Sequence, residues 1–455
     1  MKPSGWRAGL QAMAVFMTMA SAGLGADASR FRLITLDPGH FHAALVQKFM
    51  YADVDPEVHV YAPAGDDVKE HLKRIEGFNT RATDPTRWVQ RVYTGPDYLD
   101  RMVADTAGNV VVISGNNARK TDYISRSIAA GLHVLADKPM AITPADFEQL
   151  KDAFALAEQK GVLLYDIMTE RFEISTMLQR ELSQHPELFG QLQKGTAEEP
   201  AITKESVHHF SKTVAGAPLK RPQWFFDVRQ EGEGIVDVTT HLVDLIQWEV
   251  FPEQVLQPSD ASVLKARRWT TPVTPEQFKK VTGATEYPDF LQRDVKNGVL
   301  QVAGNGEFTY RLRDVHARVS VIWNFEAPPG AGDTHYSVMR GTRANLVIRQ
   351  GAEQKYKPVL YVEKAPSVNA SEHEAALRAA IDRVQAKHPG IGLRREGDAW
   401  VMTVPASYDV GHEAHFAQVT ENFLRYLRAG RLPDWEVPNM ITKYSTIMQA
   451  YELSR

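Results

Sequence analysis

The chain has 455 residues, a formal net charge of −4 at pH 7 and no cysteine. A chain of this length exceeds a single ordinary core, so we expect two domains. The small negative charge does not suit a surface that binds nucleic acid, and we expect no nucleic-acid partner. The absence of cysteine excludes disulfide bonds, thiolate metal sites and a cysteine nucleophile.

The N-terminus has the layout of a secretory signal peptide. Lys2 and Arg7 precede an apolar run that ends in small residues. We therefore predict a signal peptide over residues 1–26, with cleavage after Ala22 or Ala26, and an exported protein, either periplasmic or secreted. An uncleaved membrane anchor is the alternative, but the run is short and rich in alanine and glycine. We expect no membrane contact once the signal is removed.

Residues 30–166 alternate short apolar runs with amphipathic helices. The runs RLITL, VHVYA, VVVIS, HVLAD and VLLYD are aliphatic and β-branched, which is typical of buried parallel strands. Helical spacing marks the stretches FHAALVQKFMYA, VKEHLKRIEGF, RKTDYISRSIAAG and PADFEQLKDAFALAEQKG. This alternation predicts an α/β domain with a doubly wound parallel sheet of the Rossmann type, which would bind a dinucleotide.

Residues 167–455 have a different pattern. One helix, STMLQRELSQ, precedes longer alternating stretches such as GEFTYRLRDVHARVSVIWNFEA, THYSVMRGTRANLVIRQG and KPVLYVEK. Their alternation predicts a large open antiparallel sheet with one face toward solvent. Helical patterns return at SEHEAALRAAIDRVQAKH and EAHFAQVTENFLRYLRAG. We therefore expect an α+β domain, with a homo-oligomer forming through its open sheet.

The first predicted strand leads into LDPGHFHAAL, at the place where a nucleotide-binding fold holds phosphate. Three glycines occupy this turn in a dinucleotide fingerprint, and here Asp37, Gly39 and His42 fall on their positions. Gly39 is the one that lets the backbone approach a pyrophosphate. We predict that Gly39, His40 and Phe41 form a rebuilt phosphate turn. The alternative is an ordinary strand-to-helix turn.

The segment 110–143 carries more specific motifs. An apolar strand leads into the loop SGNN, a helix ends in Ala-Gly, and a second strand runs into Asp137-Lys138-Pro139. This stretch closely resembles the most characteristic part of the Gfo/Idh/MocA family of sugar and cyclitol oxidoreductases. YDIMTERF (165–172) and GEGIVDVTTHLVDLIQW (232–248) resemble that family's crossover and its substrate-domain segment. The resemblance implies an exported member with an oxidoreductase C-terminal domain.

The resemblance also implies a cofactor, NAD or NADP, at the carboxyl ends of the parallel strands, and we expect it to be tightly bound. The usual acidic residue after the second strand is missing, because Pro63 stands there, and Asp66 or Asp67 is the nearest replacement. Besides the phosphate turn, the residues expected to bind the cofactor are Ser114, Asn116, Asn117, Asp137 and Lys138.

Three residues are expected to carry the chemistry. Removing hydride from a secondary alcohol needs a base for the hydroxyl proton and a cation for the developing alkoxide. His241 can accept the proton, and Lys138 can stabilise the oxyanion. Asp237 lies four residues before His241, on one face if both are helical, and can orient it or bind the neighbouring hydroxyl. The family resemblance implies the same roles, whereas the alternative is a capping aspartate and a core histidine.

The substrate site is expected to include Asp237 and side chains of the kinds that hold sugars by hydrogen bonds and ring stacking. In the segment 206–228 these are Trp224 and one of two neighbouring histidines, His208 or His209. Only one of the two can face the pocket if the segment is a strand, because successive side chains alternate. Arg171 is expected either to clamp the substrate or to form a structural ion pair.

We expect no metal ion. Asp237, His241 and a neighbouring histidine could ligate a divalent cation. The stretch GHEAHF (411–416) is one residue short of the H-E-x-x-H pattern of metalloproteases. An ordinary helix start accounts for it equally well.

These observations predict an exported NAD(P)-dependent oxidoreductase that acts on a secondary hydroxyl of a small-molecule carbohydrate: a sugar, a glycoside or a polyol. One alternative is an NAD-dependent, redox-neutral glycoside hydrolase, in which a transient ketone allows the glycosidic bond to eliminate. It would need a second base, for which Tyr165 and His208 are candidates. The other alternative is a non-catalytic carbohydrate-binding protein on the same fold.

Overall fold

The computed structural model describes residues 31–214 and 217–455. The predicted signal peptide, residues 1–26, lies outside the described residues. No helix within the described ranges is long and apolar enough to cross a membrane.

Six parallel strands form the first sheet, in the order β3-β2-β1-β4-β5-β6. This is the doubly wound order of a Rossmann-type fold. VVVIS and HVLAD are neighbours in it, with Val110 opposite His133 and Ile113 opposite Ala136. The strands are β1 (Leu33–Leu36), β2 (Glu57–Ala62), β3 (Val89–Thr94), β4 (Val110–Ile113), β5 (His133–Asp137) and β6 (Leu164–Ile167).

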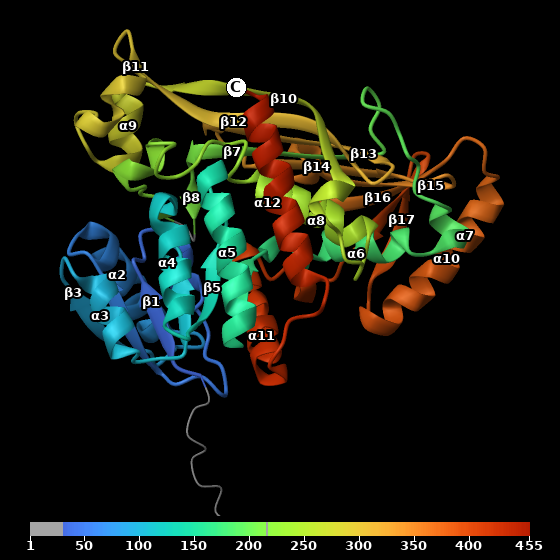
Figure 1. Ribbon diagram of the computed structural model, residues 1–455. Helices are drawn as coiled ribbons and strands as arrows, with labels where there is room; N and C mark the ends of the chain where they lie inside the picture. The colour runs from blue at the N-terminus through green and yellow to red at the C-terminus, as the bar shows by residue number, and fades with distance from the viewer. Residues whose placement is uncertain (1–30, 215–216) are drawn as a thin grey trace, which may run out of the picture.

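Two helical layers accompany this sheet (Figure 1). One layer contains α2, α1 and α11, and the other contains α3, α4, α5 and α12. The last two helices of the chain therefore return to the first sheet, where α11 packs against β6 and α12 packs against α5. The helices are α1 (His42–Leu45), α2 (Asp66–Thr80), α3 (Tyr98–Asp105), α4 (Asn117–Ala129), α5 (Pro144–Lys160), α11 (His412–Ala429) and α12 (Glu436–Leu453).

The α1 helix is much shorter than the predicted stretch of residues 41–52. Only His42–Leu45 is helical, and turns follow it. A helix this short adds few aligned peptide dipoles, so it contributes little to holding an anion at its start. The turn before it, rather than the helix, must supply most of any phosphate contact.

A second sheet contains strands in the order β10-β12-β13-β7-β14-β15-β16-β18-β17, with β11 paired to β12. The pairs are antiparallel as predicted, except that β7 runs parallel to β13, with Ile202 opposite Ala317. This sheet is therefore mixed, because β7 inserts between two hairpins. The strands are β7 (Ile202–Ser211), β10 (Ala261–Val273), β11 (Val295–Lys296), β12 (Val299–Leu312), β13 (Val315–Glu326), β14 (Thr334–Arg340), β15 (Ala344–Gln350), β16 (Val359–Lys364), β17 (Gly392–Glu396) and β18 (Ala399–Thr403), and a small hairpin pairs β8 (Thr213–Val214) with β9 (Ala217–Pro218).

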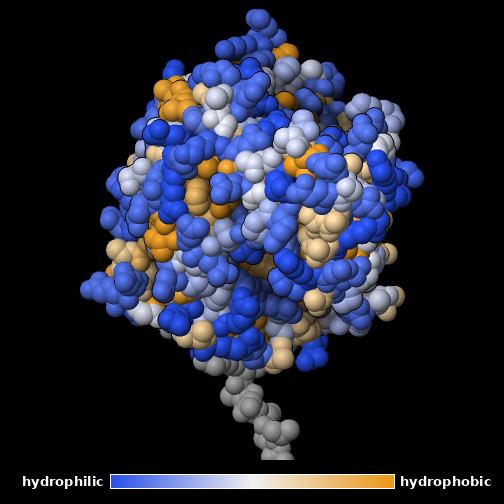
Figure 2. Space-filling model, turned by 90° about the vertical axis from the view of Figure 1, so that its right-hand side faces the viewer, coloured by the Kyte–Doolittle hydropathy of each residue, from blue (hydrophilic) through white to orange (hydrophobic). Residues whose placement is uncertain are grey.

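We call residues 31–166, with the first sheet, the first unit, and the residues after them, with the second sheet, the second unit. Helices line the side of the second sheet that faces the first unit (Figure 1). The contacts join α6 to β15, α8 to β13 and α12 to β10. One apolar core continues from the first sheet through α8 and α12 into the second sheet. Apolar side chains on the face in Figure 2 form only small, separate groups among hydrophilic ones. The remaining helices are α6 (Ile174–Ser183), α7 (Pro186–Phe189), α8 (Thr239–Val250), α9 (Pro275–Thr282) and α10 (Ala370–Lys387).

Candidate active site

The predicted catalytic residues lie together where the first sheet meets α8. Lys138 follows β5, and Asp237 lies in the turn that leads into α8 rather than in the helix itself. Lys138 Nζ donates to Asp237 Oδ1 over 2.5 Å, although 99 positions separate the two residues. His241, in the first turn of α8, lies within reach of the Lys138 charge. The fold thus brings side chains of both units to one place.

Burial and the Lys138 cation set the charge states at this place. Burial acts to lower the pKa of Lys138, but the carboxylates of Asp237 and Asp137 outweigh it and raise that pKa. Burial, together with the Lys138 cation, lowers the pKa of His241 to about 3, so its imidazole is neutral at pH 7. His241 Nδ1 is buried and has no hydrogen-bond partner among the residues that the structure describes. A neutral proton acceptor beside a cation is the arrangement that an alcohol or a ketone oxygen requires.

Both neighbouring histidines of β7 approach Asp333, but their rings have different surroundings, and His208 Nδ1 lies 3.5 Å from Asp333 Oδ2. His208 stacks on Trp323, with ring centroids 5.0 Å apart, and the Lys138 cation contributes to its lowered pKa after burial and despite Asp333. His209 Nδ1 lies 2.8 Å from Asp333 Oδ1, and its side chain is buried. His208 is therefore the one that packs on Trp323 and lies within range of the Lys138 charge.

The turn between β1 and α1 is tightly folded against the loop after β4. Gly39 N donates to Asp37 O over 2.8 Å. A Cβ atom on Gly115 would lie 2.1 Å from Asp37 O, so glycine is required where the two loops meet. Asp37 has a φ of +47° and accepts a hydrogen bond from the Tyr123 hydroxyl over 2.7 Å. Its carboxylate is therefore directed into the protein and does not repel a phosphate on the turn.

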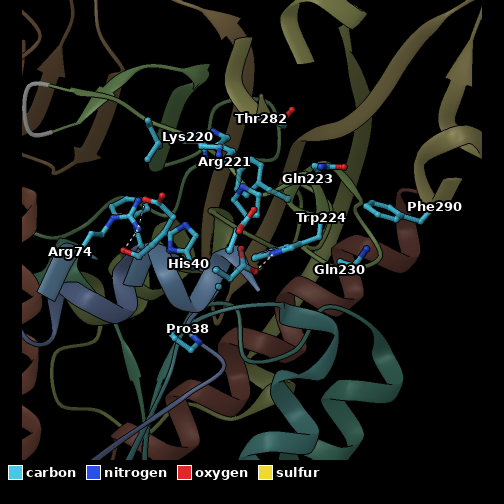
Figure 3. Close-up of a pocket in the computed structure, with 18 residues that line it drawn as sticks. Pro38, His40, Arg74, Lys220, Arg221, Gln223, Trp224, Gln230, Thr282 and Phe290 are labelled. Carbon is cyan, nitrogen blue, oxygen red and sulfur yellow. Dashed lines mark hydrogen bonds and ion pairs between the residues drawn. The ribbon is translucent and has the colours of Figure 1, made fainter. Parts of the chain in front are cut away.

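A cavity of about 420 Å³ opens beside this turn (Figure 3). Arg74 and Lys220 bring cations to its lining, and Asp66, Asp67 and Glu70 bring carboxylates. A turn with a bare backbone at Gly39, with cations for phosphate and carboxylates for ribose hydroxyls, fits the adenosine diphosphate half of a dinucleotide. The cavity also lies beside the ends of β1 and β2, where this fold binds such a ligand.

Trp224 belongs to this cavity and contacts the phosphate turn, whereas the sequence placed it at the sugar site. Its Nε1 donates to Asp67 Oδ2 over 2.9 Å. A Cβ atom on Gly39 would lie 3.0 Å from Trp224 Cζ2 and 3.0 Å from Asp67 Oδ2. In Figure 3 the indole reaches from its loop in the second unit toward the first unit. The ring therefore lies on the cofactor side of the cleft.

The loop after β4 is occupied by a segment of the second unit. Asn116 Nδ2 donates to Gln230 Oε1 over 2.7 Å, and Asn117 Nδ2 donates to Glu231 O over 2.6 Å. The backbone N–H of Asn117 donates to Gln230 O over 2.8 Å. The amide groups predicted to contact the cofactor directly are thus engaged in joining the two units.

Asp137 is held by the side chains around it. Its Oδ2 accepts a hydrogen bond from Ser114 Oγ over 2.9 Å and lies 2.9 Å from His42 Nδ1. Burial opposes the charge, but His42, Lys120 and His40 outweigh it and hold the pKa of Asp137 well below its usual range. His40 lines the cavity, and its Nδ1 lies 3.7 Å from Asp137 Oδ2. The predicted cofactor residues Ser114, His40 and Asp137 therefore form one connected group.

The start of α11 adds histidines that the sequence analysis did not place at the site. His412 Nδ1 lies 3.3 Å from Glu170 Oε1. Burial would raise the pKa of Glu170, but His412, His241 and His415 together lower it strongly. The spacing of His412 and His415 on one helical face was the available signal, but only the tertiary fold brings them near His241.

Arg171 lies in a buried ion-pair network, the structural alternative that the sequence left open. Its Nε and Nη2 donate to the two carboxylate oxygens of Asp244 over 2.6 and 2.8 Å, and Nη1 donates to Glu436 over 2.9 Å. The side chain is only 8% exposed. With its fork of donors engaged in this way, Arg171 has the structural ion pairs of that alternative.

Two family profiles match the chain. The profile described as "Oxidoreductase family, NAD-binding Rossmann fold", that of the Gfo/Idh/MocA family, matches residues 67–166. The profile described as "Putative oxidoreductase C terminal domain" matches residues 178–455, more than half of the chain. The chain belongs to the Gfo/Idh/MocA family of oxidoreductases. Its first sheet is the NAD-binding unit of this family, and its cofactor is a nicotinamide dinucleotide.

Solved structures of Gfo/Idh/MocA-type proteins agree with this assignment. A protein described as a putative oxidoreductase from Parabacteroides merdae is 56% identical, with 94% of this chain and 98% of that chain covered and a TM-score of 0.92. Levoglucosan dehydrogenase, solved with NADH and levoglucosan, is 14% identical over 93% of this chain and 96% of its own, with a TM-score of 0.59, and so shares the fold.

Among curated proteins, an uncharacterized oxidoreductase of Schizosaccharomyces pombe is 28% identical over 155 residues. The match covers 34% of this chain and 36% of that protein. The chain thus matches just over a third of that relative's length.

Proposed function

We propose that this Gfo/Idh/MocA protein is an exported oxidoreductase that acts on a secondary hydroxyl of a sugar, glycoside or polyol. The observation that carries the proposal is the 2.5 Å ion pair between Lys138 and Asp237, with the unpartnered His241 beside it. A protein that only binds carbohydrate has no need for a buried cation and a neutral imidazole at one point between two units. The levoglucosan dehydrogenase of the same fold supports a carbohydrate substrate, and the N-terminal run after Lys2 and Arg7 supports export.

The chemistry follows from the charge states of the three side chains. The nicotinamide, when bound, supplies the acceptor and donor of hydride. Lys138 donates to the substrate oxygen and stabilises the negative charge that develops on it. Asp237 holds the ammonium group in position, and the raised pKa of Lys138 keeps that group charged. His241 accepts the hydroxyl proton, because its imidazole is neutral at pH 7.

The first unit would hold the cofactor although its phosphate turn has only one of the three usual glycines, Gly39. The backbone at Gly39 would lie under the pyrophosphate, Arg74 and Lys220 would face its charge, and Asp67 would reach a ribose hydroxyl. Trp224 spans from the second unit to Asp67 over 2.9 Å, so a bound dinucleotide would be enclosed by both units. This enclosure supports tight retention, which an exported enzyme needs because free nicotinamide cofactor is scarce outside the cytoplasm.

A redox-neutral glycoside hydrolase is the second candidate, and the position of His208 favours it. Elimination next to a ketone needs a base for the carbon-bound proton, in addition to the base for the hydroxyl. His208 Nε2 is buried without a partner among the described residues, and the ring lies within range of the Lys138 charge. Tyr165, the other candidate, is buried against Phe423 and near Glu436, away from this place.

Mass spectrometry of the denatured, purified protein tests the cofactor part of the proposal. We expect released NAD(H) or NADP(H) in roughly stoichiometric amount. A carbohydrate-binding protein that lost its cofactor would release neither and would retain neither after incubation with both. Incubating the loaded protein with sugars, glycosides and polyols then separates the two enzymes. A dehydrogenase changes the bound cofactor's absorbance at 340 nm in proportion to ketone formed, whereas the hydrolase releases free sugar with no net change.

We expect a homo-oligomer to form through the outer face of the second sheet. Size-exclusion chromatography with light scattering would measure the oligomeric state.

A further inference from the structure

We propose that His40, His42 and Asp137 form a site for a divalent transition-metal ion of the zinc type, at the inner end of the phosphate turn. The three donor atoms come from two loops at the carboxyl edge of the first sheet, and all lie within 4.8 Å of one another. Among the described residues no other His, Cys, Asp and Glu set meets this spacing. The proposal goes beyond the oxidoreductase function and does not depend on it.

The separations suit one small ion. Zinc binds imidazole nitrogen and carboxylate oxygen at about 2.0–2.2 Å, which places neighbouring ligand atoms of a tetrahedral site about 3.3 Å apart. Asp137 Oδ2 lies 2.9 Å from His42 Nδ1 and 3.7 Å from His40 Nδ1, on either side of that value. Small side-chain shifts would therefore bring all three atoms to ligand distance.

Metal ligands must be free of protons, and the contact between His42 and Asp137 can release the proton that it holds. The proton that His42 and Asp137 now share can move to His42 Nε2, since neutral imidazole has two tautomers. The His42 backbone N–H approaches His40 Nδ1 only at 3.4 Å, a long contact that an ion would displace.

The charges around the site include carboxylates as well as cations. Three positive groups are near: Lys138, which Asp237 neutralises, Lys120, whose Nζ donates to the Asp137 carbonyl over 2.9 Å, and Arg221, whose charge acts on His40. Glu170 adds a carboxylate that its neighbours keep ionised. Burial and charge repulsion by Asp237 raise the pKa of Glu231 well above its usual range.

The site is accessible and has an open position. The His40 side chain lines the 420 Å³ cavity and is 18% exposed, which gives an ion a route of entry. Three protein ligands leave a tetrahedral ion one position for water or a substrate oxygen, the arrangement of catalytic rather than structural zinc. The His412 ring, whose centroid lies 6.1 Å from that of His42, is the nearest further imidazole.

Metal titration of the full-length protein tests this site. The protein is stripped with EDTA and titrated with Co²⁺, followed by visible absorption, and with Zn²⁺, followed by calorimetry. We expect about one ion per chain, and at least about a 100-fold weaker affinity in His42→Gln and Asp137→Asn, because each removes a ligand. His59→Gln is the matched control, since His59 lies on β2 of the same sheet outside the cluster and should leave the affinity unchanged.

Three results would overturn the assignment. These are no binding at millimolar Co²⁺, wild-type affinity in both the His40→Gln and His42→Gln variants, and loss of binding only in His412→Gln or His415→Gln. Circular dichroism of each variant checks folding. If Asp137→Asn does not fold, His40→Gln, whose side chain lines the cavity, replaces it in the titration. Measuring NAD(H) content of the same samples keeps the two proposals separate, because failure to bind metal leaves the cofactor result unaffected.

Discussion

At the scale of single residues, the charge on Lys138 affects the protonation of several neighbouring side chains. The same cation accounts for part of the low pKa of His241 and contributes to that of His208. It also binds Asp237 directly. Removing the ammonium group should therefore change oxyanion stabilisation and the proton affinity of the neighbouring imidazoles together.

We expect Lys138→Ala and His241→Ala each to lower kcat by about two or more orders of magnitude, the size of lost oxyanion and proton-transfer terms. Stability should change little in His241→Ala, whereas Lys138→Ala should also lower it, because the buried Asp237 carboxylate loses its partner. Steady-state kinetics on a turned-over carbohydrate would measure the effect, with His59→Ala as the control. Full activity in both variants would show that the reaction occurs elsewhere.

How far the sequence predicted single residues depended on where their partners lie. Lys138, Asp237 and His241 were predicted because family motifs mark them, and the fold brings them together. Asn116, Asn117 and Trp224 were assigned to ligands, but their partners are protein groups from the other unit. Such contacts depend on how the two units dock, which no local spacing reveals.

At the scale of elements, the phosphate turn is defined by two glycines from different loops. Gly39 leaves space in front of Trp224 and Asp67, and Gly115 allows the β4 loop to approach Asp37. Since α1 is short, backbone approach must supply what a helix dipole supplies elsewhere. The turn should therefore tolerate side chains poorly.

We expect Gly39→Val to abolish retention of NAD(H) while the protein remains folded. Its Cβ alone would lie 3.0 Å from both Asp67 and Trp224, and the valine methyl groups extend further into the cavity. Gly77→Ala in α2 is the control, because nothing lies within 4 Å of its Cβ position. Cofactor released on denaturation is quantified for both. Normal retention in Gly39→Val would place the pyrophosphate on another loop.

The α2 helix provides a pH prediction through His71. Burial lowers the pKa of His71 from an ordinary 6.5 to about 3, so below pH 6.5 the unfolded chain binds a proton that the folded chain does not. Its contribution to stability is complete above pH 6.5 and is lost as pH falls toward 3, by about 1.4 kcal/mol per pH unit. Glu173 acts in the opposite direction, because burial raises its pKa to about 7.

The difference between wild type and His71→Leu isolates the histidine. We expect the wild type to lose about 2–3 kcal/mol more of its free energy of unfolding than the variant between pH 6.5 and 4.5. Urea unfolding at both pH values measures this. An equal loss in both proteins would mean that His71 is protonated in the folded state.

Helices and strands could be predicted where apolar residues recur in the sequence at a regular spacing. The strands VVVIS and HVLAD and the helices α4 and α5 follow the expected periods. The edge strand β3 was not predicted, because its VQRVYT sequence is mostly exposed and resembles a loop. The α12 helix was also missed, since it buries polar residues such as Asn439, Thr442 and Lys443 and so lacks a clear apolar face.

At the scale of the whole molecule, one buried charge network holds the two units together. Asp166 lies on β6, Arg171 follows that strand, Asp244 lies on α8, and Glu436 and Lys443 lie on α12. Lys443 Nζ donates to Asp166 over 2.6 Å and to Asp244 over 3.0 Å. The sequence suggested one ion pair at Arg171, but it could not show a network whose members span residues 166–443.

Arg171→Met should therefore be a stability variant and not a substrate-binding variant. Removing the guanidinium leaves Asp244 and Glu436 buried without their main partner, which costs about 3–5 kcal/mol of unfolding free energy. Arg394→Met is the control, because its ion pair with Glu396 is exposed on β17, and it should leave that free energy nearly unchanged. Denaturant unfolding measures both, and kinetics of the folded Arg171→Met enzyme should give an unchanged KM, because no substrate contact is lost. Unaltered stability with a KM raised more than tenfold would restore Arg171 as a substrate clamp.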